Sequence, residues 1–131
     1  MLVGRGTNLG YYVYHVDAQG PYGENMWWNC PPLTRGAWYC VEGFVRLNSI
    51  ATSGGLPVGR KDGVLLGWLN GQLVFDRRDL RFRNVDYLKV ESMWFDVYEG
   101  GSWVAREEMD LYVDELVVAD QRVGAGLGCQ G

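Results

Sequence analysis

Residues 64–76 read VLLGWLNGQLVFD and give the clearest structural signal in the chain. Two apolar runs flank the dipeptide Asn70-Gly71. Asn-Gly supplies the two positive-φ positions of a type I′ turn, which joins antiparallel strands with a matching twist. The segment therefore predicts a β-hairpin with its turn at residues 70–71.

Further strand-like segments lie on both sides of this hairpin. Residues 10–17 (GYYVYHVD) are rich in Tyr and Val, and the period of two places Tyr12, Tyr14 and Val16 on one face. Residues 49–63 are polar and rich in Gly, which indicates a loop. A loop is expected over residues 18–35, with a short strand inside it over residues 26–29. The other expected strands are residues 37–48, 79–83, 87–99 and 109–120.

The composition indicates one folded domain. The chain has 131 residues, of which 47% are hydrophobic and 14% aromatic, so it is not disordered. No segment has a clear helical period, and the strand spacing favours an all-β antiparallel sandwich or jelly roll. We expect a single domain over residues 1–123 and a flexible Gly-rich tail over residues 124–131.

Charge and patterning exclude several classes of function. The net charge of −4 disfavours a nucleic-acid surface, which needs a basic stripe. No apolar run approaches the roughly 20 residues of a membrane helix, so no membrane partner is expected. Residues 1–10 lack the basic-then-apolar pattern of a signal peptide. As written, the sequence suits the cytoplasm, but the compartment stays undetermined.

The sequence contains three cysteines, an odd number that does not form a disulfide framework. Cys30 and Cys40 flank Pro31-Pro32 and are close enough in sequence to close a short loop. The alternative is two partly buried thiols, with Cys129 in the Gly-rich tail.

Several short motifs occur in order from Tyr12 onward. They are Tyr12-x-Tyr14, Gly36-x-Trp38 followed by Val45-x-Leu47-Asn48, Asp62-Gly63 followed by Trp68-x-Asn70-Gly71, Phe95 with Gly100-Gly101, and the strand over residues 110–118. This order resembles polysaccharide lyase family 14, the alginate and glucuronan lyases, whose domain is a concanavalin A-like jelly roll. The resemblance covers residues 5–120 and corresponds to the latter part of such a domain. Members of that family are often secreted.

The resemblance also implies a difference. The family carries a Ser-x-Arg motif and a catalytic lysine upstream of the paired tyrosines, and this sequence begins after that point. Arg5 is similar to a different arginine of the family. We therefore expect a truncated relative whose open sheet edges are covered by self-association, as a symmetric dimer.

The resemblance implies a site around Tyr12, Tyr14 and Arg5. A polyuronate lyase removes the C5 proton and expels the 4-linked oxygen, which requires an acid, a base and a group that neutralises the carboxylate. A tyrosine can act as acid or base when a cation lowers its pKa. The alternative is that the tyrosines are packed strand residues. His15, the sole histidine, is expected to be structural.

A second set of candidates suits sugar binding. Trp94, Asp96 and Tyr98 would share one face of the expected strand 87–99, with Phe95 and Val97 facing the core. Sugar C–H faces stack on aromatic rings while hydroxyls bond polar groups, and Trp28 in its loop has the same potential. The alternative is a dimer interface, which also favours Trp and Tyr.

The charged residues indicate neither a metal site nor a cofactor. One His and three scattered Cys give no zinc pattern. Asp110, Asp114 and Glu115 lack the spacing of a calcium loop. A basic cluster within residues 77–83 is interleaved with aspartates, which favours an ion-paired strand edge over an anion-binding surface. The cluster consists of Arg77, Arg78, Arg81 and Arg83.

Three functions remain open. The first is a carbohydrate-binding protein related to polysaccharide lyases but without their full catalytic machinery, with an acidic polysaccharide or an oligosaccharide as partner. The second is an active polyuronate lyase that works by β-elimination. The third is a non-catalytic oligomeric interaction protein.

Overall fold

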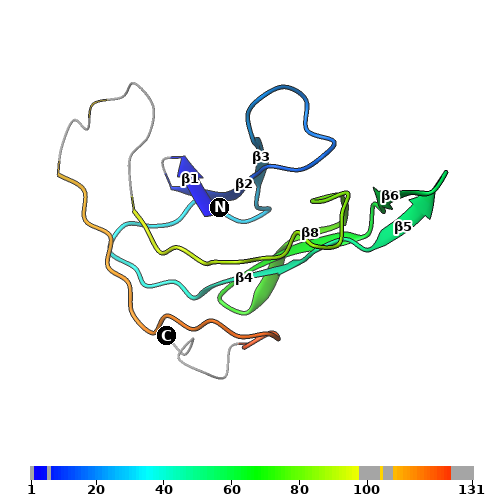
Figure 1. Cartoon of the computed structure of the whole chain (residues 1–131). Helices are drawn as coiled ribbons and strands as arrows, with labels where there is room; N and C mark the ends of the chain where they lie inside the picture. The colour runs from blue at the N-terminus through cyan, green and yellow to red at the C-terminus, as the bar shows by residue number, and fades with distance from the viewer. Residues whose placement is uncertain (1, 6, 98–103, 105–107, 125–131) are drawn as a thin grey trace.

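The computed structural model describes residues 2–5, 7–97, 104 and 108–124. These residues form eight strands and no helix, so none of their segments is a membrane-spanning helix (Figure 1). The strands are β1 (Leu2–Arg5), β2 (Asn8–Val13), β3 (Glu24–Trp27), β4 (Val41–Arg46), β5 (Ile50–Ser53), β6 (Leu56–Gly59), β7 (Gly63–Leu69) and β8 (Gln72–Leu80).

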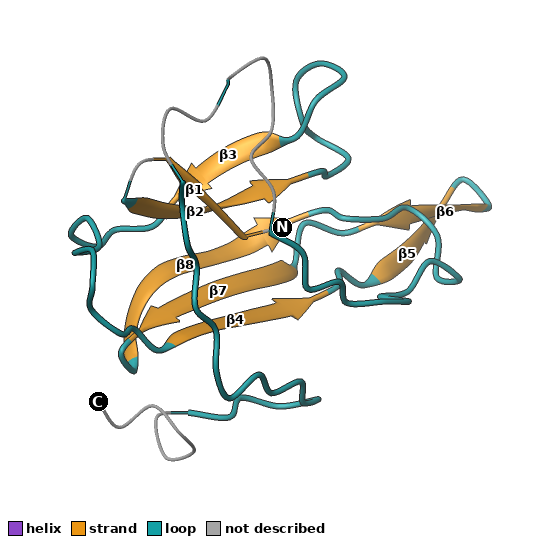
Figure 2. Ribbon diagram, turned by 90° about the vertical axis from the view of Figure 1, so that its left-hand side faces the viewer, coloured by secondary structure: helices purple, strands orange, loops and turns teal. Residues whose placement is uncertain are grey.

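The strands form two three-stranded sheets and a separate hairpin. One sheet has the order β1-β2-β3, the other has the order β4-β7-β8, and β5 pairs with β6. Every pairing is antiparallel. Figure 2 shows the sheet of β1, β2 and β3 layered against that of β4, β7 and β8, with the β5–β6 hairpin beyond one end. The predicted all-β antiparallel architecture is confirmed.

The hairpin predicted around Asn70-Gly71 is β7–β8. Asn70 and Gly71 have φ values of 50° and 79°, the left-handed pair that a type I′ turn requires. All seven residues of β7 are buried. The reason is that β7 lies between β4 and β8 and packs on both faces, and its unbroken apolar sequence suits that position.

Two glycines shape the core between the sheets. Gly43 on β4 and Gly67 on β7 are directly opposite each other. A Cβ at Gly43 would lie 2.7 Å from the Tyr11 hydroxyl, and one at Gly67 would lie 2.5 Å from the Trp28 ring. The glycines therefore leave a hollow that the Tyr11 and Trp28 rings fill, with their centroids 5.2 Å apart. The Tyr11 hydroxyl donates to the carbonyl of Leu66 at 2.7 Å.

Asn48 fastens the end of β4 to the end of β8. Its side chain is fully buried. The Asn48 amide nitrogen donates to the carbonyls of Ser49 (3.0 Å) and Arg83 (2.9 Å). Its amide oxygen accepts from the N–H groups of Phe82 (2.7 Å) and Arg83 (3.0 Å). One side chain thus satisfies four backbone groups, three of them 34 or 35 residues away.

The segment 49–63 is not the loop expected from its composition. It contains the β5–β6 hairpin, in which Ser53 pairs with Leu56 around Gly54 and Gly55. Both glycines have positive φ, 58° and 79°, so they form a two-residue hairpin turn. The strand expected over residues 10–17 ends at Val13, and that expected over residues 37–48 begins at Val41.

The strands expected over residues 87–99 and 109–120 are wrong as far as the described residues extend. Residues 81–97 and 108–124 contain no strand. The core positions expected at Phe95 and Val97 are also wrong, because both side chains are exposed. Alternating composition does not make a strand without a neighbour to accept its backbone hydrogen bonds. The strand expected over residues 79–83 is the end of β8, which stops at Leu80.

Residues 122–124 pack on the outer face of the β4–β7 pair. The Arg122 guanidinium lies 4.5 Å from the centroid of the Trp68 ring. The N–H groups of Val123 and Gly124 donate to the Glu42 carboxylate at 3.0 and 3.2 Å. Gly124, the first residue of the expected tail, is therefore held in place, and residues 125–131 lie outside the described part of the chain.

Candidate functional site

A groove of about 530 Å³ opens between the two sheets. β2 and the residue after it contribute Tyr11 to Tyr14, β4 contributes Gly43 to Val45, β7 contributes Leu65, and Phe82 follows β8. The lining is mostly apolar and includes five aromatic residues. Its size falls within the range of about 300–1,000 Å³ that ligand sites occupy.

The paired tyrosines of the sequence motif both lie on this groove. The Tyr12 and Tyr14 rings meet edge to face, with centroids 5.4 Å apart and planes at 87°. Tyr12 accepts a hydrogen bond from the Gly23 N–H at 2.9 Å, which fixes its hydroxyl. Tyr14, just past the end of β2, is 65% exposed and offers its ring to a ligand. Burial raises the pKa of Tyr11, which stays a neutral hydrogen-bond donor.

The other residues expected at a site are dispersed. Arg5 lies in β1, where its backbone pairs with Asn8, and its side chain is outside the described part. Trp28 is only 5% exposed and packs in the core, so its ring is not a surface for sugar stacking. Trp94 is 85% exposed and Asp96 is also exposed, but neither lines the groove. Tyr98 lies outside the described residues.

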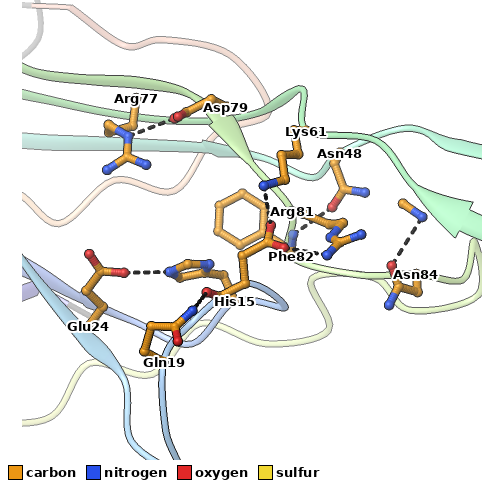
Figure 3. Close-up of polar contacts among 12 residues, drawn as sticks. His15, Gln19, Glu24, Asn48, Lys61, Arg77, Asp79, Arg81, Phe82 and Asn84 are labelled. Atoms are coloured by element: carbon orange, nitrogen blue, oxygen red, sulfur yellow. Dashed lines mark hydrogen bonds and ion pairs between the residues drawn. The ribbon is translucent and has the colours of Figure 1, made fainter.

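A polar cluster lies close in sequence to the groove residues Tyr14 and Phe82 (Figure 3). It consists of His15, Asp17, Glu24, Lys61 and Arg81. The His15 Nε2 atom lies 2.8 Å from the Glu24 carboxylate, and the His15 side chain is 7% exposed. Its Nδ1 atom is buried and has no hydrogen-bond partner within the described residues. No sequence motif indicates this pair, because Glu24 is brought close to His15 only by the β2–β3 register.

The second part of the polar cluster is centred on Asp17. Its carboxylate contacts Arg81 and lies 3.5 Å from the Lys61 ammonium. Partial burial alone would raise the pKa of Asp17, but the hydrogen bond and charge of Arg81, together with Lys61, outweigh it and hold that pKa below its ordinary value. The Val16 N–H donates to the Arg81 carbonyl at 2.8 Å, which ties this loop to the end of β8.

Three arginines of the basic cluster over residues 77–83 are ion-paired, as the interleaved aspartates predict, whereas Arg83 donates to backbone carbonyls. Arg77 binds Asp79 and Arg78 binds Asp76, both at 2.7 Å. The hydrogen bond from Arg77 is the main reason that the pKa of Asp79 is lowered. These cations are therefore already neutralised at the edge strand.

Cysteine and metal chemistry are absent from the groove. Cys30 carries a free thiol, so of the two alternatives left open by the sequence the Cys30–Cys40 disulfide is excluded, and burial raises the pKa of the Cys30 thiol. Within the residues that the structure describes, no group of three or more His, Cys, Asp or Glu side chains could hold a metal ion.

No family model, curated protein or solved structure matches this chain.

Proposed function

We propose that this protein binds carbohydrate in the groove between its sheets, on a jelly-roll scaffold of the concanavalin A-like type. The observation that carries the proposal is the exposed Tyr14 ring on an aromatic-lined groove large enough for a few sugar units. Sugar rings stack their C–H faces on aromatic side chains, and the groove offers two tyrosine rings in perpendicular orientations.

The polar cluster supports an oligosaccharide rather than a wholly apolar ligand. His15 and Asp17 follow Tyr14 closely, and Arg81 directly precedes Phe82, so donors and acceptors are close in sequence to the groove-lining residues. Lys61 is well exposed and contacts Asp17 only at 3.5 Å. An acidic sugar would compete with Asp17 for this ammonium, which is why an acidic polysaccharide remains the first ligand to test.

The experiment is a binding titration of the protein against polyuronates and neutral oligosaccharides. Tyr14→Ala should weaken binding about ten-fold, the effect of losing about 1.4 kcal/mol of stacking and burial. Tyr87→Ala is the matched control, because Tyr87 is similarly exposed, at 73%, but does not line the groove. Absence of binding to every sugar, or equal loss in both variants, would overturn the proposal.

The same samples test for turnover. β-Elimination creates a conjugated double bond that absorbs in the ultraviolet, so growing absorbance would make the protein a lyase. In that case Tyr12→Phe and Tyr14→Phe should abolish the signal, because each removes a hydroxyl that could transfer a proton. Binding without absorbance is the outcome that we expect.

A further inference from the structure

Strand β4 is an edge strand of its sheet in the part of the chain that the structure describes. Among the described residues it pairs only with β7, and Figure 2 shows it as the outermost strand of its sheet. Val41 and Val45 are 40% and 44% exposed, and Gly43 and Arg46 are exposed as well. Edges of this kind attract another strand unless charge, proline or a covering segment blocks them.

We propose that β4 pairs antiparallel with β4 of a second copy across a two-fold axis, with Phe44 opposite the partner's Phe44. The two sheets would then join into one sheet of six strands, with both β4 strands at its centre. A two-fold interface uses the same surface on both subunits, so β4 must be complementary to itself.

The register follows from the alternation of side chains. Directly opposite residues in an antiparallel pair lie on the same face, so two copies of one strand can pair only when the two opposed residue numbers have an even sum. With Phe44 on the axis, Glu42 lies opposite the partner's Arg46, and this ion pair occurs twice. Registers shifted by two residues place Phe44 opposite either Glu42 or Arg46 and give neither charge an opposite charge across the interface.

The inner face favours the same register. Gly43 would lie opposite the partner's Val45, so each valine side chain would face a residue that has no side chain. The shifted registers place two glycines or two valines opposite each other, which is a less complementary pairing. Cross-strand pairs of complementary size and charge are the unit of sheet stabilisation.

The charges needed for this pairing are in place in one copy. Arg46 has no ion-pair partner within the described part of the chain. The Glu42 carboxylate is held by the N–H groups of Val123 and Gly124 and by Arg122 at 3.4 Å, so its position on the outer face is fixed. A fixed carboxylate and an unpaired guanidinium on one strand define the self-complementary surface.

Pairing through β4 also enlarges the groove. Gly43 and Val45 line it in one copy, so the grooves of two copies would meet at the two-fold axis. The pairing itself rests on the strand edge and not on carbohydrate binding, and each can fail without the other.

Sedimentation velocity over a range of concentrations tests the pairing. The wild type should dimerise, and Arg46→Glu should weaken the dimer about ten-fold, because two attractive pairs become repulsive. Arg60→Glu changes the charge equally at an exposed arginine away from β4 and should leave dimerisation unchanged. A wild type that stays monomeric at hundreds of micromolar would overturn the proposal.

Oxidative cross-linking tests the register. Cα atoms directly opposite in an antiparallel pair lie about 4.5–5.5 Å apart, within the reach of a disulfide. Phe44→Cys should therefore give a covalent dimer under mild oxidation, whereas Leu73→Cys on the other edge strand should not. Dimerisation that resists Arg46→Glu, with no cross-link at position 44, would place the interface elsewhere and overturn this assignment.

Discussion

Strand β7 and the segment from Tyr87 to Val97 are both rich in apolar and aromatic residues, yet they have opposite environments. Every residue of β7 is buried, whereas Trp94, Phe95 and Val97 are more than half exposed. β7 lies between two antiparallel neighbours, while residues 87–97 pair with no strand among the described residues. The difference shows that composition makes a segment able to form a strand, and a paired neighbour makes it one.

The largest effect should come from Asn48→Ala, which removes the hydrogen bonds that connect the residues after β4 with those after β8. The change leaves four backbone groups without their partner, two of them N–H donors, and we expect the free energy of unfolding to fall by about 4 kcal/mol. Asn84→Ala, which removes one part-buried hydrogen bond donated by the Gly59 N–H, should cost about 1 kcal/mol, clearly less than the loss of four. Urea unfolding measures both, and equal losses would mean that Asn48 is not a clamp.

The comparison is tested by one substitution in β7 and one in residues 108–124, which, like residues 87–97, form no strand among the described residues. Leu65→Ala removes a core side chain of β7 and should lower the free energy of unfolding by about 3 kcal/mol. Leu111→Ala changes an exposed side chain in the segment without strands and should cost less than about 0.5 kcal/mol. A large loss at Leu111 would show that this segment is packed in solution, for example against a second copy.

A smaller effect should appear in the dependence of stability on pH. The Ser49 hydroxyl, 2.5 Å from the Asp62 carboxylate, is the main reason that the pKa of Asp62 is lowered, and the Ser49 N–H adds to it. A lowered folded-state pKa stabilises the fold above the unfolded-state pKa of about 3.9, and this contribution disappears as pH falls through the folded value. Ser49→Ala should thus have a lower free energy of unfolding than the wild type at pH 6. Urea titrations should show this difference in free energy becoming smaller by pH 2.

Local signals in the sequence predicted part of the fold correctly. Asn70-Gly71 fixed the hairpin because the turn needs only those two residues. Gly54-Gly55 also favours a two-residue hairpin turn, but the polar composition of residues 49–63 suggested a loop instead. The hollow of Gly43 and Gly67 could not be predicted, since it depends on a register between strands more than twenty residues apart. The strands wrongly expected near the C-terminus have the same cause, because local alternation of residues does not show whether a segment has a neighbouring strand to pair with.

The candidate site followed the same pattern. The alternation in residues 10–17 correctly placed Tyr12 and Tyr14 together, and both line the groove. Trp28 was expected in a loop, but the residues before it form β3, and its ring enters the hollow beside Gly67. The His15–Glu24 pair depends on the contact between β2 and β3, which no sequence motif indicates.

The Asn48 clamp constrains the order in which the chain folds. Its hydrogen bonds join residues about 35 positions apart, and the whole β7–β8 hairpin lies within the loop that they close. A hairpin forms in about 1–10 μs. Closing a long loop is slower, because more chain entropy is lost before the new contacts offset that loss. We therefore expect β7 and β8 to form first, β4 to add to β7 next, and the Asn48 hydrogen bonds to form last. Such late contacts slow unfolding more than they speed folding.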